Sequence, residues 1–221
     1  MRALLPPGTS SGDLTDADLI EIYDSGDTPL LRLNMVSTLD GAAIGGDGVT
    51  GSINTPPDNR IFSLLRAWAD VILIGTGTVR AEGYAAPTAD PRWSDLRAGR
   101  PEHPAMAVLT SAGTLPDGFD ASGGGESFAV TADVDTGLEG VMDRLRAKGL
   151  PRILCEGGPT VAGELLGAGL VDELCLSWTP RVVVGSAFRI AHGGQVDDDA
   201  ALLSLLEEDG TLISRWSLGR R

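Results

Sequence analysis

Short apolar runs typical of strands alternate along this chain with segments whose apolar residues follow helical spacing. Leu30–Val36 has the pattern of a strand, and Asp70–Gly75 is apolar on both faces, as expected for a strand in the middle of a mostly parallel sheet. The segment 56–68 between them begins with two prolines and carries one apolar face at i, i+3, i+4 and i+7, formed by Ile61, Leu64, Leu65 and Trp68. This alternation predicts an α/β fold.

The alternation continues through the second half of the chain and closes with a hairpin. Helices are expected near 138–145 and over 159–169, and further strands at Ala105–Thr110, Ser127–Thr131, Arg152–Cys155 and Asp172–Trp178. Two runs separated by an acidic turn predict an antiparallel pair, Ala201–Leu206 and Thr211–Leu218. The chain 1–221 is therefore expected to be a single domain around a mixed, mostly parallel sheet with a C-terminal hairpin.

Two segments stand outside this alternation. Thr15-Asp16-Ala17-Asp18 has the pattern of a capping box that opens a short helix, so residues 1–28 are expected to form an N-terminal helical extension. Residues 83–104 contain four prolines and little periodicity, which predicts a long loop. Trp93 in this loop is a candidate for a lid contact over a site.

The composition is that of an ordinary globular protein. Hydrophobic residues make up 42% of the 221 residues and charged residues 22%, which excludes a disordered or fibrous chain. The N-terminus lacks the long apolar run of a signal peptide, and no stretch approaches the ~18 apolar residues of a membrane span. We therefore expect a cytoplasmic protein without membrane partners.

Charge and metal-binding residues narrow the possible functions further. With 17 Lys and Arg against 31 Asp and Glu, the formal net charge of −14 argues against a nucleic-acid partner. The 2 Cys are not in a CxxC pair and there are only 2 His, so neither a metal site nor a disulfide scaffold is expected. An anionic small molecule is still possible where backbone amides and a few Arg side chains hold it.

Two strand–turn–helix junctions are candidates for such a site. Glu156-Gly157-Gly158-Pro159-Thr160 follows one strand and Gly75-Thr76-Gly77-Thr78 follows another. Glycines let backbone amides approach an anion closely, and a helix N-terminus favours a phosphate. Each turn alone is also compatible with plain turn chemistry, and neither matches GxGxxG or GxxxxGK[ST]. Together, at the ends of neighbouring strands, they could hold the two halves of a dinucleotide.

Five stretches carry a resemblance to a known family, in this order and spacing: 34–41 (NMVSTLDG), 64–67 (LLRA), 70–79 (DVILIGTGTV), 156–160 (EGGPT) and 169–174 (GLVDEL). They resemble the C-terminal reductase domain of the bifunctional deaminase-reductase of riboflavin biosynthesis, and its stand-alone actinobacterial pyrimidine reductase-like members. The resemblance runs from about Leu30 to Gly194. It implies a dihydrofolate-reductase-like three-layer fold, a homodimer, and NADPH-dependent reduction of 5-amino-6-(5-phosphoribosylamino)uracil to the ribitylamino compound. The sequence lacks the HxE and PCxxC zinc motifs of the deaminase half, so deaminase activity is not expected.

The resemblance also implies where NADPH would lie. The expected pyrophosphate contacts are Gly157, Gly158, Pro159, Thr160, Val161 and Ala162. The second glycine turn and its helix would add Gly75, Thr76, Thr78 and Glu82. Val36 would face the nicotinamide, and Ser52 takes the place of a family aromatic residue against the cofactor. Ser111 would lie near the adenosine 2′-phosphate, with a loop hydroxyl that caps its own backbone as the alternative.

Substrate contacts are implied for a second set of residues. Glu156 would accept N–H bonds from a heterocycle or assist proton transfer, or would simply be a glutamate favoured by the helix dipole. Arg66 would contact the substrate phosphate, or be an exposed helix arginine. Asn34 would hydrogen-bond the heterocycle or be a buried amide, and Thr50 is a further candidate. Asp40 would shape its loop through an Asx turn or act as a general acid.

One stretch departs from the family. Where members usually continue with Leu-Thr-x-Arg, this chain has Arg80-Ala81-Glu82-Gly83-Tyr84, and no arginine follows until Arg92. The loss of a bidentate phosphate partner motivates a second hypothesis, that dihydrofolate or another pterin is the substrate. A third hypothesis is an NADP-binding protein without turnover.

Overall fold

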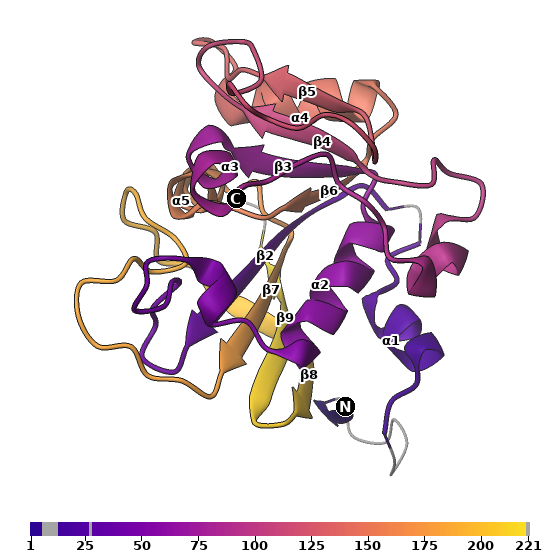
Figure 1. Ribbon diagram of the computed structural model, residues 1–221, viewed down its shortest axis with the longest axis vertical. Coiled ribbons are helices and arrows are strands. Elements are labelled where there is room, and N and C mark those ends of the chain that lie inside the picture. The colour runs from indigo at the N-terminus through magenta and orange to yellow at the C-terminus, as the bar shows by residue number, and fades with distance from the viewer. Residues whose placement is uncertain (6–12, 27, 220–221) are drawn as a thin grey trace.

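The computed structural model describes residues 1–5, 13–26 and 28–219. They form three layers, with one sheet between two layers of helices (Figure 1). The nine-stranded sheet has the order β1-β8-β9-β7-β2-β6-β3-β4-β5. Its strands are β1 (Arg2–Leu5), β2 (Leu30–Thr38), β3 (Val71–Gly75), β4 (Ala105–Leu109), β5 (Ser127–Val130), β6 (Arg152–Cys155), β7 (Glu173–Thr179), β8 (Ala200–Glu208) and β9 (Thr211–Leu218). The strands from β7 to β5 in this order pair in parallel, whereas β1, β8 and β9 pair antiparallel. The predicted mixed sheet with a C-terminal hairpin is confirmed.

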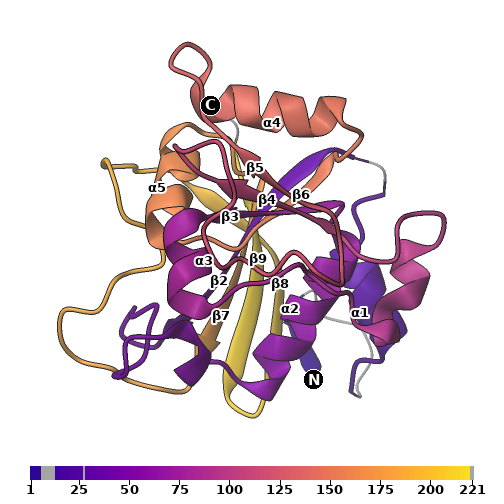
Figure 2. The ribbon, with the colours of Figure 1, turned by 45° about the horizontal axis from the view of Figure 1, so that its top comes forward.

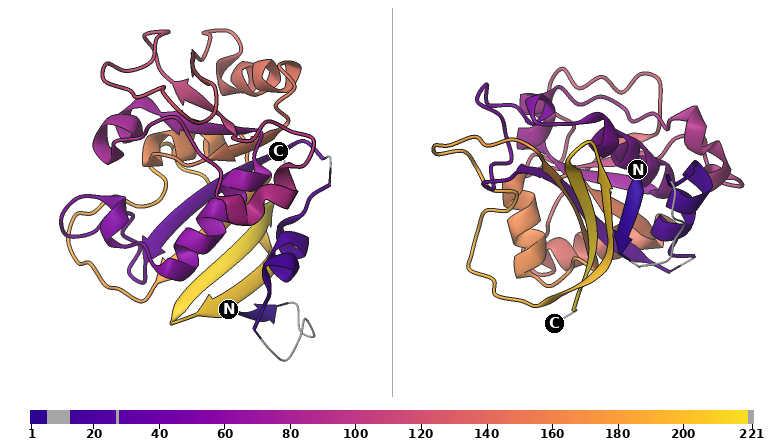
Figure 3. Two further views of the ribbon diagram at one scale, coloured as in Figure 1. Left: turned by 45° about the vertical axis from the view of Figure 1, so that its right-hand side comes forward. Right: turned by 90° about the horizontal axis from the view of Figure 1, so that it is seen from below.

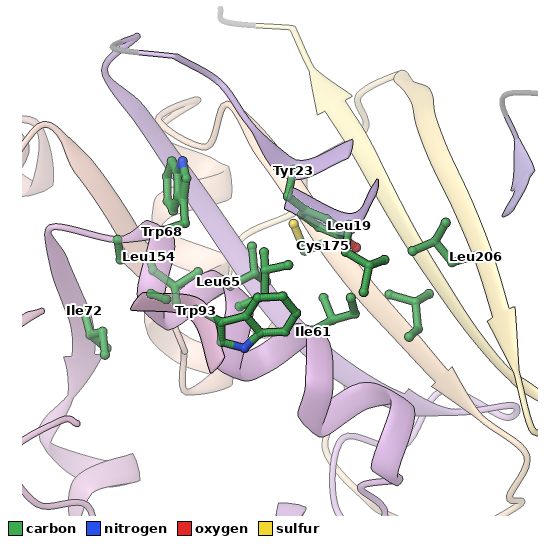
Figure 4. Close-up of a cluster of buried hydrophobic side chains, with 14 of the residues drawn as sticks. Leu19, Tyr23, Ile61, Leu65, Trp68, Ile72, Trp93, Leu154, Cys175 and Leu206 are labelled. Carbon is green, nitrogen blue, oxygen red and sulfur yellow. The ribbon is translucent and has the colours of Figure 1, made fainter. Parts of the chain in front are cut away.

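Helices cover both faces of the sheet, and each face has its own apolar core. The helices are α1 (Asp16–Tyr23), α2 (Pro56–Trp68), α3 (Thr76–Glu82), α4 (Gly137–Ala147) and α5 (Pro159–Gly167), with short 3-10 turns at η1 (Thr50–Ser52) and η2 (Pro91–Arg97). Helices α1 and α2 lie on one face of the sheet, and α4 and α5 on the other (Figure 2). Apolar side chains of α1, α2 and η2 contribute to one core, and those of α4 and α5 to the second. The predicted apolar face of α2 is fully inside the first core, together with Tyr23 and Cys175 (Figure 4).

The N-terminal segment differs in part from its prediction. The Thr15 capping box opens α1 as expected, with the Thr15 hydroxyl accepting from the Asp18 amide. Residues 2–5, however, form the edge strand β1, which pairs with β8 (Figure 3). A four-residue strand has too little pattern to be recognised from sequence, since its order depends on the hairpin beside it.

The proline-rich loop also differs from its prediction. It contains η2, and Trp93 in that turn is fully buried against α2, where its indole N–H donates to the Ser63 hydroxyl at 2.7 Å. Trp93 is therefore a core residue, and the interpretation as a lid contact is wrong. The sequence pattern failed because a lone tryptophan among prolines has no periodicity that marks burial.

Asp70 connects the start of β3 with β6 and with the proline-rich loop. Its carboxylate accepts from the backbone amide and guanidinium of Arg152 at 3.0–3.1 Å and from Arg100 at 3.0 Å. Burial opposes ionisation of this group, but the hydrogen bonds from Arg152 and Arg100 outweigh it and lower the pKa of Asp70.

We expect Asp70→Asn to lower the free energy of unfolding at pH 7 by about 1–3 kcal/mol. Because the pKa of Asp70 is lower in the folded protein, its stabilisation is present above the unfolded pKa of about 3.9 and is lost as the pH falls through the folded value. Urea unfolding of both proteins between about pH 7 and pH 3 should show the difference narrowing below about pH 4. If the difference in unfolding free energy between the two proteins stayed constant from about pH 7 to pH 3, the lowered pKa of Asp70 would be contradicted.

Candidate active site

A cavity of about 760 Å³ lies beside the carboxyl ends of β3 and β6, between α2, α3 and α5. Asn34 and Val36 of β2 contribute to its lining, and Val36 is almost fully buried. This volume is in the range of small-molecule sites, and the carboxyl ends of parallel strands are where α/β folds bind ligands.

The two glycine turns meet in this cavity. Because β3 and β6 are parallel neighbours, their turns leave the sheet side by side, and the Gly75 amide donates to the Gly157 carbonyl at 3.0 Å. A Cβ on Gly158 would lie 2.4 Å from the Thr78 hydroxyl, and one on Gly75 would lie 2.9 Å from Val161. The turns therefore form a cradle without side chains at the N-terminus of α5, which fits the diphosphate of a dinucleotide.

The cavity brings together most of the residues predicted to contact the cofactor. It is lined by Val36, Gly75, Thr78, Glu82, Gly158, Pro159, Thr160 and Val161. Gly157 is not among these lining residues, but it shapes the turn before Gly158 with a φ of +92°, a value that favours glycine.

Four other predicted cofactor residues lie outside the cavity, because local contacts hold them elsewhere. The Ser52 hydroxyl donates to Asp47 at 2.7 Å, and the Thr76 hydroxyl donates to the Leu109 carbonyl at 2.9 Å. Ala162 is fully buried in the core under α5, whereas Ser111 is exposed. The structure thus gives no geometric support to a cofactor contact from these four side chains.

Arg66 and Glu156 form a bidentate ion pair in the lining of the same cavity, where Glu156 directly precedes the glycine turn at Gly157. Arg66 Nε and Nη2 each donate to one oxygen of Glu156 at 2.7 Å. The Glu156 side chain is 1% exposed and that of Arg66 19% exposed. The guanidinium also lies 4.3 Å from the ring centre of Phe62 and 5.5 Å from that of Tyr84. The alternative of an exposed helix arginine is therefore wrong.

Tyr84 and Phe62, the two rings beside Arg66, also line the cavity, and no sequence pattern identified them. Burial and the charge of Glu156 raise the pKa of Tyr84 above its ordinary value, so its phenol stays protonated at neutral pH. Phe62 could have been found by spacing, because Asp58, Phe62 and Arg66 occupy positions i, i+4 and i+8 of α2 and all line the cavity.

The remaining predicted substrate residues divide between the cavity and its surroundings. Asn34 and Thr50 line the cavity. The Asp40 carboxylate is not among the described cavity-lining groups; it accepts from the Thr38 hydroxyl at 2.6 Å and the Val183 amide at 3.0 Å. These hydrogen bonds lower the pKa of Asp40, which favours the loop-shaping role over that of a general acid.

The connection between β7 and β8 adds residues from a distant part of the sequence. Phe188 and His192 of this connection line the cavity. The His192 amide donates to the Pro159 carbonyl at 2.9 Å, and its backbone packs where a Cβ on Gly163 would lie. The sequence pattern assigned His192 no role, because a histidine in a loop has no local spacing that indicates a site.

Within the described residues, no three His, Cys, Asp or Glu side chains are grouped so that they could hold a metal ion. Cys155 and Cys175 are buried free thiols that pack in the two cores. None of the helices in the described ranges is both long enough and apolar enough to span a membrane.

Comparison with known proteins supports the resemblance seen in the sequence. The RibD C-terminal domain family matches residues 29–210. The 2,5-diamino-6-ribosylamino-4(3H)-pyrimidinone 5′-phosphate reductase of Methanothermobacter thermautotrophicus is 29% identical over 199 residues, covering 78% of this chain and 88% of that protein. The riboflavin biosynthesis protein RibD of Escherichia coli is 28% identical over 72% of this chain, which spans only 50% of that longer protein.

Solved structures share the fold. A pyrimidine reductase-like protein from Corynebacterium diphtheriae superposes with a TM-score of 0.75 at 22% identity, covering 91% of this chain and 98% of that one. A deaminase and 5-amino-6-(5-phosphoribosylamino)uracil reductase from Thermotoga maritima gives a TM-score of 0.69 at 17% identity, covering 87% of this chain and 57% of that one. At these identities the structures establish the three-layer α/β fold.

Proposed function

Because this chain belongs to the RibD C-terminal domain family, we propose that it is a riboflavin-biosynthesis reductase that uses NADPH. Its substrate is 5-amino-6-(5-phosphoribosylamino)uracil or the corresponding 2-amino-4-oxopyrimidine, and its product is the ribitylamino compound. The observation that carries the proposal is that the glycine cradle and the Arg66–Glu156 pair line one cavity.

One group of cavity residues would bind the cofactor. Gly158, Thr78 and the first turn of α5 would hold the cofactor diphosphate. Val36 would cover one face of the nicotinamide and exclude water from it. When bound, NADPH would supply the hydride that converts the imine form of the ribosylamine to the ribitylamine.

The substrate phosphate would have to share Arg66 with Glu156. Arg66 is the only arginine among the described residues that line the cavity. Arg92, the next arginine after the divergent stretch, lies 4.0 Å from Asp16 in another part of the molecule. This arrangement motivates dihydrofolate or a related pterin, which carries no phosphate, as the second candidate substrate.

The function is tested by following NADPH oxidation with both phosphoribosylaminopyrimidines and with dihydrofolate in parallel. We expect a much higher kcat/KM for one of the phosphoribosyl compounds, because Arg66, Asn34 and Thr50 all line the substrate side of the cavity. A preference for dihydrofolate would support the second candidate. NADPH binding without oxidation of any of the three would indicate a binding protein without turnover.

We also expect a homodimer in solution, since the strands and closing hairpin offer a sheet surface that a second subunit could cover. Light scattering on the purified protein measures this directly.

A further inference from the structure

A cluster of buried polar side chains lies on the face of the sheet that α1 and α2 cover. We call it the Arg32 cluster, and it consists of Arg32 (β2), Glu173 (β7), Arg215 (β9), Ser204 (β8) and Tyr23 (α1). Arg32, Tyr23 and Ser204 are at most 1% exposed, and the side chains of Glu173 and Arg215 are 12% and 15% exposed. None of the five is among the described residues that line the cavity, so the proposed function gives this cluster no task.

The register of the sheet brings these side chains together from both ends of the chain. Arg32 of β2 is paired with Glu173 of the parallel strand β7. Cys175, two residues further along β7, is paired with Arg215 of β9, and Arg215 is paired with Ser204 of β8. Paired residues, and residues two apart on one strand, share a face of the sheet. All of these side chains therefore point toward the same helical layer.

Arg32 keeps two of its three guanidinium nitrogens without a protein partner. Its Nε donates to Glu173 at 2.7 Å, and its guanidinium lies 4.0 Å from the ring centre of Trp68 on α2. These contacts leave Nη1 and Nη2 buried, with no hydrogen bond to any described residue. A guanidinium stays charged at every ordinary pH, so the N–H groups of Nη1 and Nη2 remain donors in search of an acceptor.

Three other buried donors of the cluster also lack a partner. Arg215 Nε, the Tyr23 hydroxyl and the Ser204 hydroxyl form no hydrogen bond within the described part of the chain. The Tyr23 ring lies 5.7 Å from the Arg215 guanidinium, and Figure 4 shows it beside Cys175. Burial raises the pKa of Tyr23, so its phenol stays protonated at neutral pH and can donate. Buried polar groups are rarely left without a partner, and so many in one cluster indicate a bound acceptor.

The charges of the cluster favour an anion as this acceptor. Arg32 and Arg215 contribute two positive charges, and both are paired with the same carboxylate, that of Glu173, at 2.7 and 3.7 Å. The cluster therefore carries one positive charge in excess. A buried charge without a counter-charge is costly, and a neutral water molecule would leave it uncompensated. A monovalent anion removes the excess and accepts from several donors at once.

We propose that the Arg32 cluster is a binding site for a small monovalent anion such as chloride, held by Arg32, Arg215 and the Tyr23 hydroxyl. The anion would join α1 to β2, the strand on which Asn34 follows Arg32 by two positions and lines the cavity. Tyr23 and Arg215 both lie outside the matched range 29–210, so segments beyond the family match help to build the site. It is separate from the cavity and does not depend on the proposed function.

Bromide and chloride serve as probes of the wild-type protein. In crystals soaked in sodium bromide we expect an anomalous peak within hydrogen-bond distance of Arg32 Nη1 or Nη2 and of the Tyr23 hydroxyl. In solution, sodium chloride should raise Tm in a saturable manner above sodium gluconate of equal ionic strength, because a ligand that binds only the folded state stabilises it. A cluster without a bromide peak, or equal Tm values in the two salts, would overturn the proposal. A peak without the saturable rise would mean binding at crystal concentration only and would overturn it too.

Two variants test the donors themselves. Tyr23→Phe keeps the buried ring and removes only the hydroxyl, so the chloride concentration that gives half of the Tm increase should rise about 10-fold or more, as is typical of one hydrogen bond to a charged group. Arg32→Met removes the cation and two donors and should abolish the chloride dependence of Tm. If Arg32→Met does not fold, Tyr23→Phe still decides the matter. An unchanged chloride response in Tyr23→Phe would contradict the assignment of this hydroxyl to the site.

A matched pair of serine variants provides the control. Ser204→Ala removes a hydroxyl of the cluster and should weaken the chloride response, whereas Ser127→Ala should leave it unchanged. Ser127 is half-buried on β5, at the opposite edge region of the sheet from β8. Equal responses in the two variants would exclude Ser204 from the site. Since these measurements need neither NADPH nor substrate, a failure of the proposed function would not affect them.

Discussion

Replacement of Gly158 by valine is expected to abolish NADPH-dependent turnover, with a loss of about 100-fold or more in NADPH affinity. The backbone of Gly158 is extended, at φ −73° and ψ −169°, a φ/ψ region that is not reserved for glycine. The effect is steric: a Cβ would lie 2.4 Å from the Thr78 hydroxyl, and the rest of the side chain would fill the cradle. NADPH affinity is measured by fluorescence titration and turnover by NADPH oxidation.

Gly167→Val on the same helix is the control for this substitution. Gly167 is exposed at the end of α5, and nothing lies within 4 Å of the position of its Cβ. We expect this control to keep its affinity for NADPH. If Gly158→Val also retained NADPH binding, the cofactor would have to lie away from the glycine cradle.

Arg66→Met is expected to lower the free energy of unfolding by about 3–5 kcal/mol and to remove activity. The substitution leaves the Glu156 carboxylate, with its side chain 1% exposed, without its cation partner. A buried charge that loses its partner keeps its full desolvation cost. Chemical denaturation of the variant and the wild type measures the loss of stability.

The double variant Arg66→Met with Glu156→Leu separates stability from function. Replacing both members of a buried ion pair by apolar residues is often neutral, so most of the lost stability should return. Activity should stay absent, because the proposed contact to the substrate phosphate is gone. Recovery of turnover together with stability would show that the pair is structural and does not bind the substrate.

Most of the secondary structure, and the family, could be predicted from patterns in the amino-acid sequence. Whether a segment forms a helix or a strand depends largely on the spacing of its apolar residues over a few positions. This is why α2, the buried strand β3 and the closing hairpin could all be predicted. The first turn of α5 was also evident, because Gly158 and Pro159 are typical of a helix start. Where local pattern was weak, as in the edge strand β1, the prediction failed.

The assembly of the candidate site, in contrast, depends on contacts between elements that are far apart in the sequence. The Gly75 amide reaches the Gly157 carbonyl because β3 and β6 are neighbours in the sheet, although the two residues are far apart in sequence. Arg66 is similarly joined to Glu156, a pairing that no local spacing implies. The burial of Asp58 and Trp93 likewise depends on what packs over them. Local propensities determine the elements, whereas the charge environment of each side chain is fixed only when distant elements pack together.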